Sequence, residues 1–289
     1  MLPFAFHSRL IRRFMSISAS EFAYVRKLVA DHAAINLEFG QEYLVESRLA
    51  AVAGKYGVGS ASEFISRAVT KPSEELKQKI IEAITTNETL FFRDAHPFEA
   101  LRKDLLPEFL QKNIRERSLA IWCAACSTGQ EPYSIALLLR EHFPQVLGWD
   151  LEILATDLSE EALARAREAR YSQFEVNRGL PEALLLKYFL HQGTDWVLHD
   201  EVRPMVNFRH LNLARNWPAL PQFDLILLRN VLIYFSVPMK QKILAIVRRC
   251  LKPNGYLFLG TAETAMNLDA AFEQVQFGRA SCYRLRQTA

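Results

Sequence analysis

The sequence has little cysteine, little net charge and no long hydrophobic run, and each shortage excludes a class of protein. Four cysteines among 289 residues are too few for a disulfide framework, so we expect a reducing cytoplasm. A net charge of +3 gives no reason to expect nucleic acid as a partner. Membrane insertion is not expected, because no stretch approaches the roughly 20 apolar residues of a spanning helix. Half of the residues are nevertheless hydrophobic, enough for a sizeable core.

The first 17 residues do not have the order of a secretory signal. Their arginines follow the short apolar run, whereas a signal carries its positive charges in front. We expect a mobile tail over 1–17. A start upstream of Met15, and a transit or surface-binding amphipathic segment, remain as alternatives.

Residues 18–86 have the pattern of a small helical domain. Ser18 and Glu21 fit a capping box, and apolar residues then recur at helical spacing. Further helices are predicted over 41–57, from Ser60 or Ser62 to about 72, and over 73–85. No chemistry is visible in this block, so it is either a stabilising cap or a docking surface.

From Ala95 onward, short apolar runs alternate with helices. The apolar runs cover 119–125, 151–157, 223–230 and 256–261, and the helices cover 96–111, 132–143, 159–170 and 237–251. This alternation indicates an α/β fold whose parallel sheet is covered on both faces. The chain end alternates around Gly278 like an antiparallel hairpin. Residues 178–213 do not follow this alternation of apolar runs and helices, and they indicate a small β-insertion.

The turn CSTGQEPYS (126–134) after the first apolar strand is suited to a ligand. It has one glycine where a dinucleotide fingerprint needs three, and it lacks the G-K-[ST] of a phosphate loop. Glu131 would repel a pyrophosphate and attract an ammonium or sulfonium. The plainer interpretation is an ordinary strand-to-helix turn.

Polar side chains also end the other strands. Asp157 is placed to accept hydrogen bonds from two ribose hydroxyls, because Ser159 is the better helix cap. Arg229 and Asn230 end a run too apolar to need an arginine for packing. Asn212 suits a nucleobase edge or a turn. Together these signals fit adenosylmethionine better than a dinucleotide and favour a methyltransferase.

Five motifs resemble those of the chemotaxis receptor glutamate methyltransferases, the CheR family. They are NETLFFR (87–93), AACSTGQEPYS (124–134), ATDLS (155–159), RNVLIYF (229–235) and GYLFLGTAE (255–263), in the family's order and spacing. The resemblance covers about 18–285. It implies a helical N-terminal domain (18–86), a segment lining the cofactor site (87–98) and a Rossmann-like methyltransferase domain (99–289). That domain has a seven-stranded mixed sheet with a C-terminal hairpin and carries a small β-subdomain.

The resemblance also implies the site and the reaction. The implied cofactor-binding residues are Asn87, Thr89, Arg93, Glu131, Asp157, Asn212, Leu213, Arg229 and Asn230. Gln130 stands where some members have Glu. The cofactor would be S-adenosyl-L-methionine, which leaves S-adenosyl-L-homocysteine after methylating a glutamate side chain. A glutamate with a pKa near 4.3 is already ionised at neutral pH, so no general base is required. Arg93 would steer the acidic substrate, and Tyr234 would line the methyl path or pack in the core.

Helical chemoreceptors are the partners that the family implies, in adaptation of chemosensory signalling. The N-terminal helices would meet them through basic residues, which are otherwise a solvated face: Arg26, Lys27, Arg48, Lys55 and Arg67. The loop HQGTDWVLHDEV (191–202) is shorter than in members that tether to a receptor pentapeptide, so we expect no such tethering. We expect a monomer.

Three other functions can be compared with this one. Cys123 and Cys126 have C-x-x-C spacing, but a structural zinc site needs four ligands and no second pair exists. A regulatory module that binds adenosylmethionine without transferring the methyl group stays open. Methylation of a small molecule by the same fold stays open as well.

Overall fold

A computed structural model of the chain describes residues 17–85, which form one compact unit, and residues 88–287, which form another. The tail expected over 1–17 lies outside the described residues except for its last position. Within the described ranges, no helix is both long and apolar enough to cross a membrane.

The first unit is a set of helices whose starts were visible in the sequence. They are α2 (Ala19–Ala33), α3 (Glu42–Lys55), α4 (Ala61–Thr70) and α5 (Glu74–Ile84). The capping box is confirmed: the Ser18 hydroxyl accepts the Glu21 N–H at 3.2 Å, and the Glu21 carboxylate accepts the Ser18 N–H at 2.6 Å. Ser60, rather than Ser62, caps α4.

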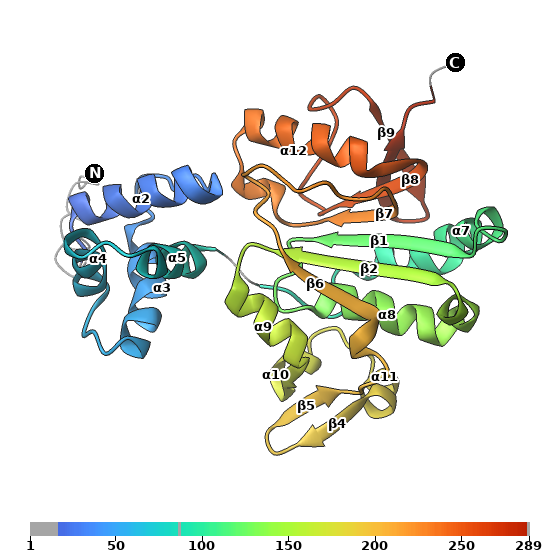
Figure 1. Ribbon diagram of the computed structural model, residues 1–289, viewed down its shortest axis with the longest axis horizontal. Coiled ribbons are helices and arrows are strands. Elements are labelled where there is room, and N and C mark those ends of the chain that lie inside the picture. Colours follow the sequence, from blue (N-terminus) through green and yellow to red (C-terminus); the bar gives the residue numbers. More distant parts are fainter. Residues whose placement is uncertain (1–16, 86–87, 288–289) are drawn as a thin grey trace, which may run out of the picture. The chain divides into compact units, whose positions relative to one another are not determined.

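The second unit contains the predicted mixed sheet. Its strands are β1 (Ser118–Ala124), β2 (Asp150–Asp157), β6 (Val206–His210), β7 (Phe223–Leu228), β8 (Leu251–Leu259), β9 (Phe272–Phe277) and β10 (Ala280–Leu285). They lie in the order β6-β2-β1-β7-β8-β10-β9 (Figure 1). The first five run parallel, and β9 and β10 form the antiparallel hairpin predicted around Gly278. The α/β fold class is confirmed.

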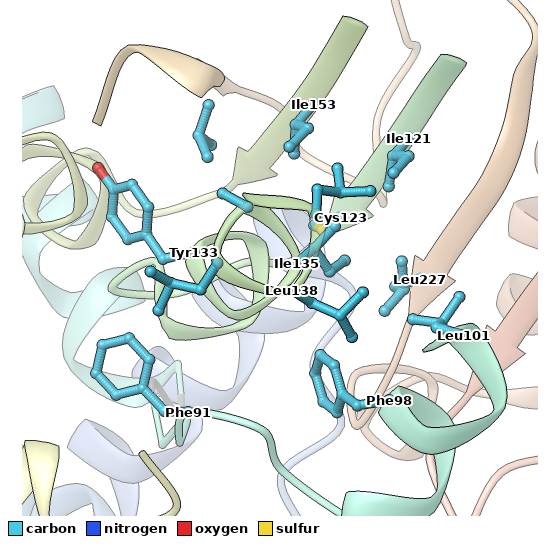
Figure 2. Packing of buried hydrophobic residues seen from close by; sticks show 14 of the residues in the cluster. Phe91, Phe98, Leu101, Ile121, Cys123, Tyr133, Ile135, Leu138, Ile153 and Leu227 are labelled. Carbon is cyan, nitrogen blue, oxygen red and sulfur yellow. The ribbon is translucent and has the colours of Figure 1, made fainter. Parts of the chain in front are cut away.

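Alternate side chains of each central strand enter different cores. On β1, Ile121 and Cys123 belong to one buried cluster and Trp122 to the other. Figure 2 shows the first cluster, where Ile121 and Cys123 face Ile135 of α8. The helices α8 (Gln130–His142) and α9 (Glu160–Glu168) contribute to this core, and α12 (Val237–Cys250) contributes to the other. This two-sided burial is why the strands read as continuous apolar runs.

The helix expected over 96–111 has no break along the chain but changes its hydrogen bonding. It consists of α6 (Ala95–Ala100), a π-helical turn (Leu101–Leu105) and α7 (Leu106–Lys112). Pro107 has no N–H to donate and its ring would crowd the carbonyl four residues earlier, which accounts for a wider turn before it.

The small β-subdomain does not coincide with 178–213. Its strands are β3 (Arg170–Ser172), β4 (Phe189–Gln192) and β5 (Asp195–Leu198), joined by α10 (Gln173–Val176) and α11 (Glu182–Tyr188). The sheet therefore begins directly after α9. β6, which was expected in the insertion, is the edge strand of the main sheet beside β2. Alternation of apolar and polar residues suits an edge strand as well as a short hairpin, so the sequence pattern did not separate the two.

The order of the main sheet reverses between β1 and β7. From β1 the chain builds outward through β2 to β6, and then crosses to β7 on the other side of β1. In such sheets ligands bind outside the carboxyl ends of the strands at this switch point. The opposite, amino end of the same strands is tied by Asp224 of β7, which is buried. Its carboxylate accepts from Asn113 Nδ2 at 2.9 Å, the Ala120 N–H at 2.9 Å and Lys252 Nζ at 2.8 Å.

Replacing Asp224 is expected to destabilise the second unit. Asp224→Ala leaves a backbone N–H and a lysine without their acceptor, so the free energy of unfolding should fall by at least about 2 kcal/mol. Asp200→Ala is the matched control, because Asp200 is 87% exposed and pairs with Arg203 at the surface. Thermal denaturation compares the two, and equal shifts for both variants would contradict a structural role for Asp224.

Candidate functional site

The turn that follows β1 is a tightly wound backbone. Ala125, Ser127 and Gly129 have φ values of +57°, +52° and +92°, all in the left-handed region. A side chain at Gly129 would place its Cβ 3.0 Å from the Cβ of Ala166. Non-glycine residues rarely adopt this conformation, and such positions concentrate at functional sites. The turn is therefore a candidate ligand cradle.

Asp157 ends β2 beside this turn. Its carboxylate accepts the Ser127 N–H at 2.8 Å and the Ser159 N–H at 2.9 Å. Burial raises the pKa of the Asp157 carboxyl. Ser159 caps α9 by accepting the Ala162 N–H at 3.1 Å, as its position predicted. Each carboxylate oxygen of Asp157 can accept a second hydrogen bond, which suits a pair of hydroxyls on a ligand.

Arg229, just past β7, is a buried cation with a side chain 2% exposed. Its Nη1 donates to Glu131 at 2.6 Å, and its Nη2 donates to Asp94 and to the Arg93 carbonyl, both at 2.9 Å. Among the described residues, its Nε is buried and has no partner. A buried donor without an acceptor is costly, so this atom suits an anionic ligand group such as a carboxylate.

The segment 88–94 lies along this site and is fixed by its two phenylalanines. Phe91 is fully buried, with its ring 5.0 Å from that of Tyr171. Phe92 donates its N–H to the Ser134 hydroxyl at 2.9 Å. Phe92 and Asp94 are both left-handed, with φ of +48° and +57°.

The polar residues of the same segment are more accessible. Arg93 is half-buried and donates from Nη1 to the Glu88 carbonyl at 3.1 Å. Thr89 is half-buried. Asn87 lies outside the described residues.

The remaining predicted site residues differ in their burial and in their contacts. Asn230 directly follows Arg229 and is left-handed, with φ of +58°. Asn212 accepts the Ala214 N–H at 2.9 Å, the turn role that its sequence position left open. Leu213 is buried in the core that α12 covers. Tyr234 is half-buried in the short helix Leu232–Tyr234.

Sequence reasoning missed three residues of this edge. Asp94 pairs with Arg229, Tyr171 donates its hydroxyl to the Thr128 carbonyl at 2.9 Å, and Glu263 accepts the Asn230 N–H at 2.7 Å. Asp94 and Glu263 stand in or next to the motifs, but nothing in their spacing shows which groups they bind.

The cysteines of the C-x-x-C pair, Cys123 and Cys126, are free and buried. Burial raises the pKa of both thiols well above the usual value. A thiol that remains protonated is a poor metal ligand and a poor nucleophile.

Comparison with known proteins gives matches over nearly the whole chain. The family model described as the CheR methyltransferase all-alpha domain matches residues 20–85, and the CheR methyltransferase SAM binding domain matches residues 87–280. Chemotaxis protein methyltransferase 1 of Pseudomonas aeruginosa is 39% identical over 276 residues, covering 94% of this chain and 100% of that protein. Chemotaxis protein methyltransferase Cher2 of Pseudomonas putida is 37% identical with the same coverage. The chemotaxis protein methyltransferase of Vibrio anguillarum is 37% identical over 94% of this chain and 99% of its own length.

Gly179 provides a direct test of how the segment 88–94 is held. Its φ is +91°, and a Cβ there would lie 2.0 Å from the Phe91 carbonyl oxygen. Gly179→Ala should therefore displace the segment. Gly193→Ala is the matched control, because Gly193 is also left-handed, at +66°, and a Cβ there meets nothing within 4 Å.

We expect Gly179→Ala to lower the free energy of unfolding by at least about 2 kcal/mol more than Gly193→Ala does. A cost of this order is typical when an extra methyl group is forced into a filled site. Hydrogen exchange at the Phe92 amide should accelerate in the first variant alone. Similar stability and similar Phe92 exchange in the two variants would show that the segment does not depend on this contact.

Proposed function

The chain belongs to the CheR methyltransferase family, and we propose that it methylates chemoreceptors in chemosensory adaptation. The reaction transfers a methyl group from S-adenosyl-L-methionine to glutamate side chains and leaves γ-methyl esters. The observation that carries the proposal is the cluster of Asp157, Glu131 and Arg229 at the switch point of a sheet that the family models match. The proposed setting is the cytoplasm, in keeping with four buried, free cysteines.

The strand-end residues fit the cofactor in charge and hydrogen bonding. Asp157 would accept from the ribose hydroxyls, Glu131 would attract the positive charges, and the unpartnered Arg229 Nε would meet the carboxylate. Thr89, Arg93, Asn212, Leu213 and Asn230, with Asn87, complete the proposed set. When bound, the cofactor supplies an electrophilic methyl group on a sulfonium.

The protein's share of the chemistry is positioning. A substrate glutamate is already ionised at neutral pH, so its oxygen attacks without a base. What the chain must do is align that oxygen and exclude part of its water. Arg93 donates to a carbonyl, a neutral partner, so its positive charge can still attract an acidic side chain. Tyr234 is the candidate to line the methyl path.

The proposed substrate is the helical methylation region of a chemoreceptor. The first unit is the candidate docking domain, through Arg26, Lys27, Arg48, Lys55 and Arg67. Arg26 already stacks on the ring of Phe39, which is 81% exposed, so a cation and an aromatic face stand together at the surface. A two-residue turn, Gly193–Thr194, joins β4 to β5, which supports recognition without pentapeptide tethering.

The activity test uses methyl-labelled S-adenosyl-L-methionine and receptor cytoplasmic fragments. We expect base-labile, volatile label on the receptor helices, at the same rate with and without the receptor's C-terminal pentapeptide, because an ester hydrolyses in base. Cofactor binding without label transfer would instead favour a regulatory module. Label that appears in small molecules alone would favour a small-molecule methyltransferase, and a rate that depends on the pentapeptide would refute the tethering proposal.

Site variants test the residue assignments separately. Asp157→Ala should weaken cofactor binding at least about tenfold, because the loss of one hydrogen bond to a charged acceptor lowers the affinity by about that factor. Arg93→Ala should lower kcat/KM about 10- to 100-fold, the usual result of misplacing a reactant. Asp150→Ala, at the exposed start of β2, and Arg115→Ala are the matched controls. Binding by calorimetry and initial rates are the measurements, and near wild-type methylation in both site variants would refute the assignment.

A further inference from the structure

Glu263 joins the ends of two neighbouring strands. Neither the proposed mechanism nor the sequence patterns assign a role to this residue. Its Oε2 accepts the N–H groups of Asn230 and Gly260, both at 2.7 Å. Its Oε1 accepts the N–H of Ile233 at 3.2 Å. One half-buried carboxylate thus holds three backbone donors, and hydrogen bonds to a charged acceptor are stronger than neutral ones.

The strand geometry explains why a carboxylate is needed here. β7 and β8 are parallel neighbours, with Leu228 opposite Leu259, so both chains leave the sheet side by side. The N–H groups just beyond have left the sheet ladder and need another acceptor. A carboxylate has two oxygens and about four acceptor positions, whereas a glutamine has one oxygen and would turn its NH2 toward an N–H donor. Glutamate is the longest carboxylate side chain, and an aspartate would be one methylene shorter.

Gly260 shows how closely these groups approach. A Cβ at this position would lie 2.7 Å from Glu263 Oε2, and 2.8 Å from both the backbone N and the Nδ2 of Asn230. Both the main chain and the side chain of Asn230 therefore lie against Gly260. Asn230 is also left-handed, a conformation that asparagine adopts more readily than most side chains but still at some cost in free energy. The carboxylate bonded to its N–H is in place to hold this conformation.

We propose that Glu263 is a positioning residue for the cofactor site. It fixes the left-handed backbone of Asn230, and through Ile233 it fixes the turn that carries Tyr234. The inference rests on the proposed function, because Asn230 and Tyr234 are site residues only there. It adds a residue that acts on the cofactor site through its neighbours rather than by touching the cofactor.

The test compares Glu263→Gln with Glu273→Gln in the full chain. Glu273 is a matched control, because its half-buried carboxylate bonds the Arg284 side chain at 2.7 Å and no site backbone. Titration calorimetry with S-adenosyl-L-homocysteine should show a dissociation constant raised about tenfold in Glu263→Gln and unchanged in the control. Amide exchange of Asn230 and Ile233 in the ligand-free chain should accelerate in Glu263→Gln alone.

Faster amide exchange with an unchanged dissociation constant would overturn the proposal, because the carboxylate would then be structural only. If Glu263→Gln does not fold, Gly260→Ala is the second variant: its Cβ would press on both Glu263 Oε2 and Asn230, so it disturbs the contact between them and should raise the same dissociation constant. Unaltered binding in this variant would also overturn the proposal. Wild-type protein that binds the ligand but does not label receptors would refute the proposed substrate and leave this comparison valid. Wild-type protein that does not bind the ligand would refute both.

Discussion

The buried guanidinium of Arg229 is the interaction on which the rest of the site depends. A charge with 2% of its side chain exposed has lost its water, and only opposite charges and hydrogen bonds can replace that water. Glu131 and Asp94 supply the charges, and the Arg93 carbonyl supplies a further bond. These partners come from the first turn of α8, from the start of α6 and from the segment before it. Removing any one acid would leave the cation short of a partner, so the segments are mutually constrained.

These contacts fix the backbone at the carboxyl edge of the sheet before a ligand binds, and they do not supply a catalytic group. Left-handed residues gather along it, at Ala125, Ser127, Phe92, Asp94 and Asn230, and each needs its surroundings to hold it. A methyl transfer to an ionised carboxylate requires alignment more than proton transfer, so a rigid edge is what such chemistry needs. The same reasoning explains the segment 88–94, in which Phe91 is buried for anchorage while Arg93 keeps an accessible charge.

The sequence predicted the parts of the fold that depend on local pattern and period. Continuous apolar runs identified the central strands because both faces of the sheet are covered, and Ser159 showed which residue caps α9. The edge strand β6 was not predicted in the main sheet, because its alternation of apolar and polar residues suits an edge strand of that sheet as well as a short hairpin. Asp94 and Glu263 were missed for a different reason. The partner of Asp94 lies 135 positions away, and two of the three partners of Glu263 are backbone N–H groups 30 and 33 positions away. Almost every residue has a backbone N–H, so the residue type does not show which one donates to a distant carboxylate.

The most direct test of the central claim is a crystal structure of the chain with S-adenosyl-L-homocysteine. We expect the ligand at the carboxyl ends of β1, β2 and β7, with its ribose against Asp157 and its amino-acid end beside Glu131 and Arg229. A ligand bound at another edge of the sheet, or bound at this edge without contact to Asp157, would contradict this expectation.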